Sequence, residues 1–295
     1  MIAKEMKFKR ATAAMAILLL ALANPFAGAA VTPEEAAKLK SALTPLGAEK
    51  AGNKDGTIPA WEGGYTQVWP GYQSGQPRPD PFSSEKPLFQ ITAKNMAQYA
   101  GQLSDGVKAL LQRHPTYRLD VYPTHRTAAA PQWVYDNTFK NATRARLAPN
   151  VSVGSEVEGA YGGIPFPIPR DGAEAMWNHL LAWHGEAFVY DFGSYVVPAN
   201  GRPVLATAAT FEDQYPYYYR DGTLDRFGGN YWSVKITTTG PPFRAGEKTL
   251  VIYPARGKSL QAWQYLVGQR RVRRAPTIAY DTPSFVTSGF SFIDE

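Results

Sequence analysis

The sequence predicts an α+β protein in which helices cover an open antiparallel sheet. Apolar and polar residues alternate in at least four segments after residue 187, as expected for strands with one buried face. From residue 117 onward, one stretch, 171–184, has a strong helical period. The chain also contains 17 Tyr, 14 Phe and 7 Trp, a density typical of β-rich proteins and of proteins that bind apolar ligands.

The composition excludes several classes of protein. Hydrophobic residues make up 44% of the 295-residue chain, which excludes intrinsic disorder. The net charge is +6, but residues 1–29 hold four basic residues and one acid, which leaves +3 on the rest of the chain. Charge alone therefore gives no case for binding to nucleic acid. The absence of cysteine excludes disulfides, thiolate metal sites, a cysteine nucleophile and an acylated N-terminal cysteine.

Residues 1–29 have the pattern of a cleaved export signal. A basic segment, 6–10, precedes 13 apolar residues, 11–23, and residues 27–29 form an Ala-Gly-Ala cleavage site. We expect cleavage after Ala29 and a soluble mature protein in the periplasm. An uncleaved membrane anchor is the alternative, although the apolar stretch is short for a bilayer span.

Residues 30–90 are expected to form an N-terminal helix followed by a strap. Thr32 and Glu35 form a capping box, and the helix should end near Leu43. The segment 47–87 is rich in Gly, Pro and aromatic residues and has no periodic element. The aromatic residues favour an extended strap packed against other structure, with a flexible arm as the alternative.

Residues 91–295 are expected to form a helix and an antiparallel domain. A helix is predicted over 91–113, with Ser104-Asp105-Gly106 as a point where it can break into two. Another helix begins at its cap Asp171 and ends before Gly185. From Tyr117 the sequence changes to short runs that predict strands or extended pieces. The apolar residues of these runs are Leu119, Val121, Trp133, Val134, Tyr135, Phe139, Val151 and Val153.

The later strands follow one another as an antiparallel meander. Asn200-Gly201 is a strong hairpin turn between two of them. The alternating segments are 188–196, 204–211, 232–236, 250–252 and 263–267. Together with the extended pieces after Tyr117, they predict one antiparallel sheet packed by the 171–184 helix. The chain stops at 291–295 in mid-pattern, which predicts that the domain is incomplete at its C-terminus.

No catalytic or metal-binding pattern is present. His179 and His184 would lie about 140° apart on a helix, which is unsuitable for one metal ion. The metalloprotease and nucleophile-elbow motifs are absent. Glu156 and Glu158 share a strand face and resemble a carboxylate pair. Two acids in a Gly-flanked strand, however, more often belong to a solvated sheet edge. The residues therefore predict a protein that is not an enzyme and needs no cofactor.

The aromatic sheet is the strongest functional feature. An apolar concavity closed by amphipathic helices is typical of a site for a hydrophobic ligand. An ordinary core is the alternative interpretation. The residues expected to line the concave face are Trp232, Val234, Ile236, Trp263, Tyr265 and Val267.

Four arginines within five residues form the densest charge cluster. Arg271 and Arg273 would lie on one face of a strand, and Arg270 and Arg274 on the other. One interpretation is an edge strand protected against aggregation by charge. The other is that Arg271 and Arg273 contact an anionic partner, such as a lipid head group.

Four motifs resemble those of a known family. They are GTIPAWEGG (56–64), PTYRLDVYP (115–123), GAYGGIPFPIP (159–169) followed by DGAEAMWNH (171–179), and GKSLQAWQYLVGQRR (257–271). With them, the chain beyond the export signal resembles the exported proteobacterial family called domain of unknown function thirteen twenty-nine, which is also labelled outer-membrane-lipoprotein-sorting-like.

The resemblance implies a fold similar to the periplasmic carriers LolA and LolB, an open half-barrel sheet with an apolar concave side plugged by helices. It implies partners of two kinds, a transporter of the resistance-nodulation-division type and an outer-membrane protein. It supplies no catalytic residues, and it implies that the strands completing the sheet lie beyond this C-terminus. The expected function is to carry a lipid or a lipoprotein acyl chain in the cell envelope. A structural adaptor of a transport complex and an exported hydrolase are the alternatives.

Overall fold

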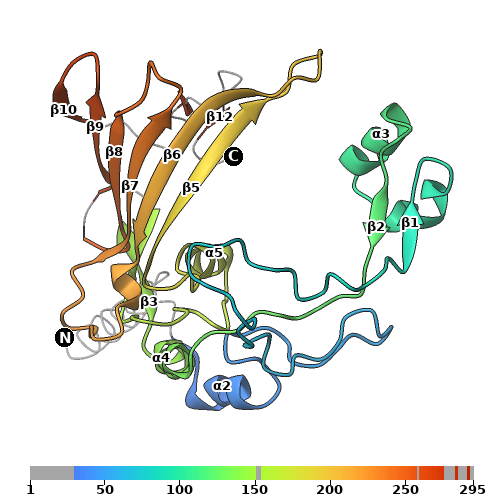
Figure 1. Cartoon of the computed structure of the whole chain (residues 1–295). Helices are drawn as coiled ribbons and strands as arrows, with labels where there is room; N and C mark the ends of the chain where they lie inside the picture. Colours follow the sequence, from blue (N-terminus) through green and yellow to red (C-terminus); the bar gives the residue numbers. More distant parts are fainter. Residues whose placement is uncertain (1–29, 151–153, 258, 276–282, 285–290, 293–295) are drawn as a thin grey trace, which may run out of the picture. The chain divides into compact units, whose positions relative to one another are not determined.

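The computed structural model describes residues 30–150, 154–257 and 259–275, and the backbone of two short strands, β11 (Pro283–Ser284) and β12 (Ser291–Phe292). The expected export signal lies outside the described residues. Two compact units make up the described chain (Figure 1). The larger unit contains 30–41, 45–48 and the chain from 130 onward, and the smaller contains 42–44 and 49–129.

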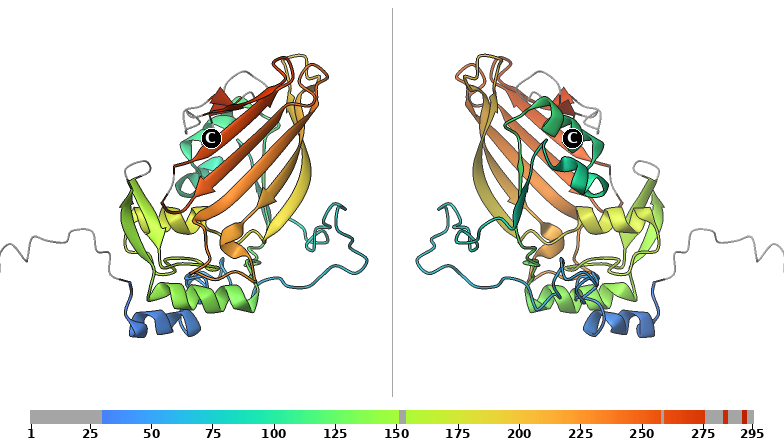
Figure 2. Two further views of the ribbon diagram at one scale, coloured as in Figure 1. Left: turned by 90° about the vertical axis from the view of Figure 1, so that its left-hand side faces the viewer. Right: turned by 90° about the vertical axis from the view of Figure 1, so that its right-hand side faces the viewer.

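A six-stranded antiparallel sheet forms most of the larger unit. Its order is β10-β9-β8-β7-β6-β5, so each pair of neighbours in the sheet is also consecutive in sequence (Figures 1 and 2). The strands are β5 (Ala187–Val196), β6 (Val204–Gln214), β7 (Asn230–Gly240), β8 (Lys248–Pro254), β9 (Gln261–Leu266) and β10 (Arg271–Arg274). This open meander confirms the predicted α+β class with antiparallel sheets and helices.

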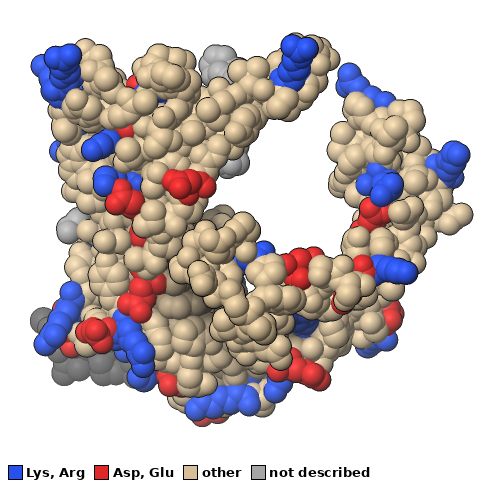
Figure 3. All heavy atoms as spheres, viewed as in Figure 1, with Lys and Arg blue, Asp and Glu red and all other residues tan. Residues whose placement is uncertain are grey.

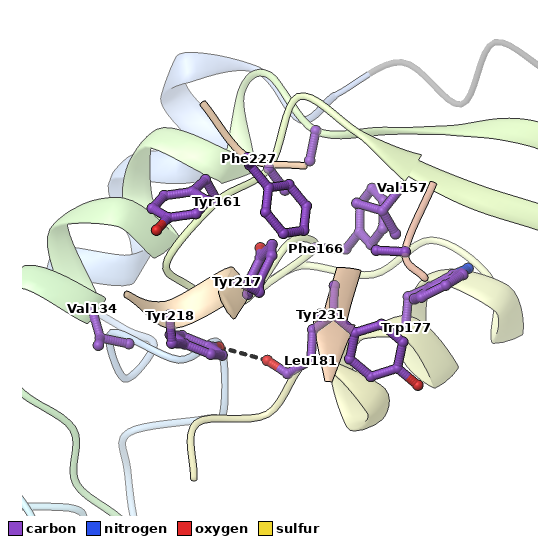
Figure 4. Packing of buried hydrophobic residues seen from close by; sticks show 13 residues of the cluster. Val134, Val157, Tyr161, Phe166, Trp177, Leu181, Tyr217, Tyr218, Phe227 and Tyr231 are labelled. Carbon is purple, nitrogen blue, oxygen red and sulfur yellow. Dashed lines mark hydrogen bonds between the residues drawn. The ribbon is translucent and has the colours of Figure 1, made fainter. Parts of the chain in front are cut away.

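The larger hydrophobic cluster lies at one end of this sheet, which we call the proximal end, and a smaller one, of Val234, Val251 and Ala262, lies on the sheet itself. The connection from β6 to β7 contains a short 3-10 helix, η3 (Pro216–Tyr218), whose Tyr217 and Tyr218 are almost completely buried. The Tyr218 hydroxyl donates a hydrogen bond of 2.5 Å to the backbone oxygen of Leu181 (Figure 4). Because buried hydroxyls need partners, this bond fixes the connection against the chain that follows α5 (Gly172–Leu180).

Helix α5 begins as the sequence predicts. The side chain of Asp171 accepts a hydrogen bond of 2.8 Å from the backbone N–H of Glu174 and so caps the helix. On its apolar side, Trp177 packs edge-to-face on Tyr231 of β7, with ring centroids 6.2 Å apart (Figure 4). The helix is therefore anchored to the proximal end of the sheet.

The motif at 159–169 forms a largely buried connection without regular secondary structure. It crosses helix α4 (Gln132–Ala142), where the fully buried side chain of Asn141 binds its backbone. The Asn141 amide donates to the oxygen of Gly163 at 3.0 Å, and its oxygen accepts from the N–H of Tyr161 at 3.2 Å. These bonds satisfy backbone groups that would otherwise be buried without partners.

The N-terminal elements of the larger unit are short. Helix α2 (Pro33–Ala37) has the predicted capping box and continues as the 3-10 turn η1 (Lys38–Lys40), ending earlier than predicted. Strands β3 (Arg146–Asn150) and β4 (Gly154–Glu158) form a separate hairpin. None of the described helices is long and apolar enough to cross a membrane.

The smaller unit contains the strap. The segment 47–87 forms no helix or extended strand. Hydrogen bonds from side chains to backbone oxygens link it to residues 126–128. The Trp61 indole N–H donates to the oxygen of Ala128 at 2.8 Å, and the Arg126 guanidinium donates to the oxygens of Glu49 and Lys50. The rest of the unit is β1 (Phe89–Ile91), η2 (Met96–Gln102), α3 (Asp105–Arg113) and β2 (Leu119–Val121).

Three predictions of local structure were wrong. The run from Trp133 to Phe139 forms α4 and not a strand, because its buried residues recur at helical spacing despite their β-favouring types. The helix predicted over 91–113 does divide at Ser104, which caps α3, but it does not begin at Ile91, which ends β1. The chain from Tyr117 onward forms several antiparallel sheets and not one. Val151 and Val153 lie outside the described residues.

Candidate ligand-binding surface

The two sets of predicted ligand-binding residues lie on opposite faces of the six-stranded sheet. Lys235 pairs with Leu250, and Leu250 pairs with Trp263, so these three side chains project on one side. Val234 precedes Lys235 in β7 and therefore projects on the other side. One face carries Trp232, Val234 and Ile236, and the opposite face carries Trp263 and Tyr265, with Val267 in the turn after β9.

A continuous chain of seven aromatic rings crosses the face that carries Val234, and we call it the aromatic face. Neighbouring ring centroids are 4.4–6.3 Å apart. In order of contact the rings are Phe192, Phe211, Tyr190, Phe188, Tyr215, Trp232 and Tyr253. Phe188 and Tyr190, on the outermost strand, remain 36% and 43% exposed. An apolar molecule can therefore contact the row at β5 without displacing the core.

One carboxylate lies on the aromatic face. Asp213 of β6 is 3% exposed, and its Oδ1 accepts a hydrogen bond of 2.6 Å from the Trp232 indole N–H. Its Oδ2 is buried without a hydrogen-bond partner among the described residues. Burial raises the pKa of Asp213, while the Trp232 bond and the nearby His184 oppose the rise. Burial also raises the pKa of Tyr215 to about 12, and the Asp213 charge adds to the effect.

The opposite face is charged and carries a groove. Lys235 and Glu212, on neighbouring strands, form an ion pair there. The groove has a volume of about 840 Å³, and its lining is mainly apolar. It runs along β8 and β9 toward the turns at their far ends. Its apolar lining residues include Leu250, Trp263, Tyr265, Val267 and Val272.

The arginine cluster lies at the edge of the sheet. β10 pairs only with β9 among the described strands, and its four residues are all exposed. Arg271 and Arg273 pair with Leu266 and Gln264, which places them on the side of the aromatic face. Their exposure suits both interpretations of the cluster, edge protection and an anionic contact.

The carboxylates of β4 have structural partners. Glu156 accepts hydrogen bonds from the Asn150 side chain at 2.8 Å and from the N–H of Gly257 at 2.7 Å, and Glu158 pairs with Arg146. They therefore hold the β3–β4 hairpin together. The described residues contain no group of three or more His, Asp or Glu arranged to hold a metal ion.

Sequence reasoning assigned one of the seven rings of the aromatic face, Trp232, to the ligand and missed the other six and the buried carboxylate. Phe188, Tyr190 and Phe211 alternate in predicted strands. Only the register of strand pairing shows that they share a sheet face with Trp232. Asp213 follows Glu212 in the sequence, and the pair resembles turn acids. A single sequence contains no pattern from which the burial of Asp213 could be predicted.

The comparisons with known proteins identify a family. The model of the family described as protein of unknown function (DUF1329) matches residues 90–295. An uncharacterized protein of Pseudomonas aeruginosa, PA3922, is 38% identical over 284 residues, which cover 94% of this chain and 61% of that protein. The chain thus spans about three fifths of the length of this relative.

A solved structure also matches a part of the chain. It is the crystal structure of a DUF1329 family protein from Desulfovibrio piger, with 16% sequence identity and a TM-score of 0.26. The match covers 35% of this chain and 39% of that protein. The family match over 90–295, together with the Pseudomonas relative, shows that this chain belongs to the DUF1329 family.

Proposed function

We propose that this chain is a binding or carrier protein for a hydrophobic ligand, which it holds against the aromatic face of the six-stranded sheet. The supporting observation is the unbroken row of seven rings, in which Phe188 and Tyr190 on the edge strand β5 are partly exposed. The ligand class is an acyl chain or a similarly apolar molecule.

The difference between the two faces supports this choice. The charges of Lys235 and Glu212 suit a face in contact with water. The aromatic face holds one carboxylate, Asp213, which accepts a hydrogen bond from the indole N–H of Trp232 on the same face. Covering one aromatic side chain with an apolar ligand is worth roughly 1.5–3 kcal/mol, so contact with two or three rings gives useful affinity.

The cellular setting is part of the same proposal. The export pattern of residues 1–29 supports a periplasmic location. The open antiparallel sheet with α5 at its proximal end is compatible with a half-barrel carrier similar to LolA and LolB. A transporter of the resistance-nodulation-division type and an outer-membrane protein are the partners that the family resemblance implies.

The groove on the opposite face is the second candidate site. Its volume of about 840 Å³ lies within the usual range for small-molecule sites, roughly 300–1,000 Å³. It includes Trp263, Tyr265 and Val267, three of the residues that sequence analysis assigned to the ligand.

A matched pair of substitutions distinguishes the two sites. Tyr190→Glu places a carboxylate on the aromatic face, and Tyr265→Glu places one in the groove. Each protein is exported, purified from the periplasm without detergent and analysed for bound lipid by solvent extraction and mass spectrometry. We expect Tyr190→Glu to lose most of the lipid because an ionised group is poorly solvated beside an acyl chain, and Tyr265→Glu to retain it.

Each other outcome has a definite meaning. Loss of lipid in Tyr265→Glu alone assigns the ligand to the groove. An unmodified protein that carries no lipid contradicts the carrier function and favours a structural adaptor.

A further inference from the structure

The two ends of the six-stranded sheet differ in how their turns are packed. At the proximal end, the connections between β6 and β7 and between β8 and β9 are built into the core through Tyr217, Tyr218, Phe227 and Ala255. We call the other end the distal end and define it as 195–204, 240–249 and 266–273. These segments hold the turns β5–β6, β7–β8 and β9–β10, which a meander brings to the same end (Figure 1).

Each distal turn exposes large apolar side chains. Phe243, in the β7–β8 turn, is 81% exposed, and Val197 and Val272 are each 65% exposed. Exposed apolar groups gathered at one end of a protein mark an interaction surface. The exposed apolar residues of the distal end are Tyr195, Val197, Val204, Phe243, Val267 and Val272.

The same turns are basic. They contain six basic residues, and Glu247 is the one acid in these segments. The Arg244 guanidinium already binds Glu247, with the Arg244 Nε 3.0 Å from the Glu247 Oε2. Lys and Arg side chains lie at both upper corners of the sheet in Figure 3. The basic residues are Arg202, Arg244, Lys248, Arg270, Arg271 and Arg273.

The backbone at Arg270 supports a role for its side chain. With a φ of 51°, it is the one non-glycine residue of the described chain in the left-handed region. Glycine adopts this conformation without the steric cost of a Cβ atom. A basic residue at such a position in an exposed turn carries a steric cost that glycine would avoid, which is in line with a role for its side chain.

We propose that the distal end docks on the surface of a bilayer that contains anionic lipids. Phe243 and the neighbouring valines enter the interfacial layer, while the arginines contact lipid phosphates. Apolar groups interspersed with basic groups are the combination that such a surface binds. This inference goes beyond the proposed function, because it concerns where the protein docks and not what it carries.

The test uses the chain from Ala30 onward, so that the apolar export signal cannot bind lipid. Vesicles are either phosphatidylcholine alone or an equal mixture of phosphatidylcholine and phosphatidylglycerol, and binding is measured by flotation at low and high salt. We expect binding to the mixed vesicles that weakens as salt screens the charges. Failure to bind the mixed vesicles at low salt, or equal binding to both kinds of vesicle, would overturn the proposal.

Matched charge variants locate the contact. Arg271→Gln combined with Arg273→Gln removes two distal charges, and Arg220→Gln combined with Arg226→Gln removes two exposed charges near the proximal end. A basic residue at an anionic surface is worth about 1 kcal/mol, so the distal pair should weaken partitioning roughly 10- to 30-fold. Equal effects of the two pairs would contradict docking through the distal end.

Two single variants test the proposal even if the distal pair folds poorly. Arg270→Gly removes a charge and relieves the backbone, so binding should weaken about fivefold with no fall in melting temperature. Phe243→Ser should weaken binding about tenfold or more at both salt concentrations, because its contribution is apolar. Unchanged vesicle binding in both variants would refute insertion of the distal turns.

Discussion

The buried carboxylate of Asp213 affects the pH dependence of the protein's stability. Its carboxylate lies among the rings of the aromatic face, with one oxygen bonded to Trp232 and the other without a partner among the described residues. Burial raises its pKa above the ordinary value of 3.8. The folded state therefore binds a proton more readily than the unfolded state, and ionised Asp213 lowers the free energy of unfolding at neutral pH.

Asp213→Asn is expected to raise the melting temperature at pH 7 by a few degrees. The amide oxygen can still accept from Trp232, while the cost of burying a charge disappears. The gain should shrink as the pH falls from the raised pKa of Asp213 toward 3.8, because Asp213 is then neutral in the parent protein as well. Thermal unfolding followed at pH 7 and pH 4 measures this. A variant that is less stable at pH 7 would contradict the account of Asp213.

Asn141 is a second residue whose importance depends on the fold. It is fully buried in α4 and binds the backbone of Tyr161 and of Gly163 in the 159–169 connection. Sequence analysis treated its neighbourhood as extended, since Trp133 and Phe139 are typical of strands. The connection and α4 approach each other closely at Gly163, which has no space for a side chain. A Cβ atom there would lie 2.3 Å from the backbone nitrogen of Thr138.

Asn141→Ala should lower the free energy of unfolding by roughly 2–4 kcal/mol, because backbone groups of the connection lose their partners in a buried site. Lys140→Ala, at the exposed neighbouring position, is the control and should change stability by less than about 0.5 kcal/mol. Chemical denaturation of both variants measures the difference. Similar stabilities would show that the Asn141 bonds are replaced by water.

At the scale of elements, local patterns predicted most of the sheet but not its faces. The alternating segments near 188–196, 204–211 and 232–236 became β5, β6 and β7, and Asn200-Gly201 lies in the β5–β6 turn. Alternation predicts which residues of one strand share a face. Pairing register decides which residues of neighbouring strands lie on the same face of the sheet. Register is fixed by contacts between strands, which is why the residue sets containing Trp232 and Trp263 were grouped although they lie on opposite sides.

The start of α5 was predictable because capping is local. Asp171→Ala removes the bond to the N–H of Glu174 and should destabilise the protein by about 1 kcal/mol. Asp221→Ala, which changes an exposed acid in a turn, is the matched control. Calorimetric melting of the two variants compares them. Equal melting temperatures would mean that α5 is held by Trp177 and its packing alone.

At the scale of the whole molecule, local sequence patterns did not predict how the chain divides into two units. The sequence predicted an N-terminal strap and a domain from residue 91, whereas the smaller unit of the structure combines the strap with β1, α3 and β2. Strand β2 pairs with β1 across about 30 residues, and nothing in the short segment at Leu119 identifies that partner. Long-range pairing of short strands is therefore the least predictable part of this fold.

The central claim is that an apolar ligand lies along the aromatic face. Its most direct test is photo-crosslinking with a diazirine-labelled fatty acid, followed by peptide mass spectrometry. We expect adducts on β5 and β6 near Phe188, Tyr190 and Phe211, and their loss when unlabelled fatty acid competes. Adducts confined to β9 and β10, or labelling that unlabelled fatty acid does not reduce, would contradict it.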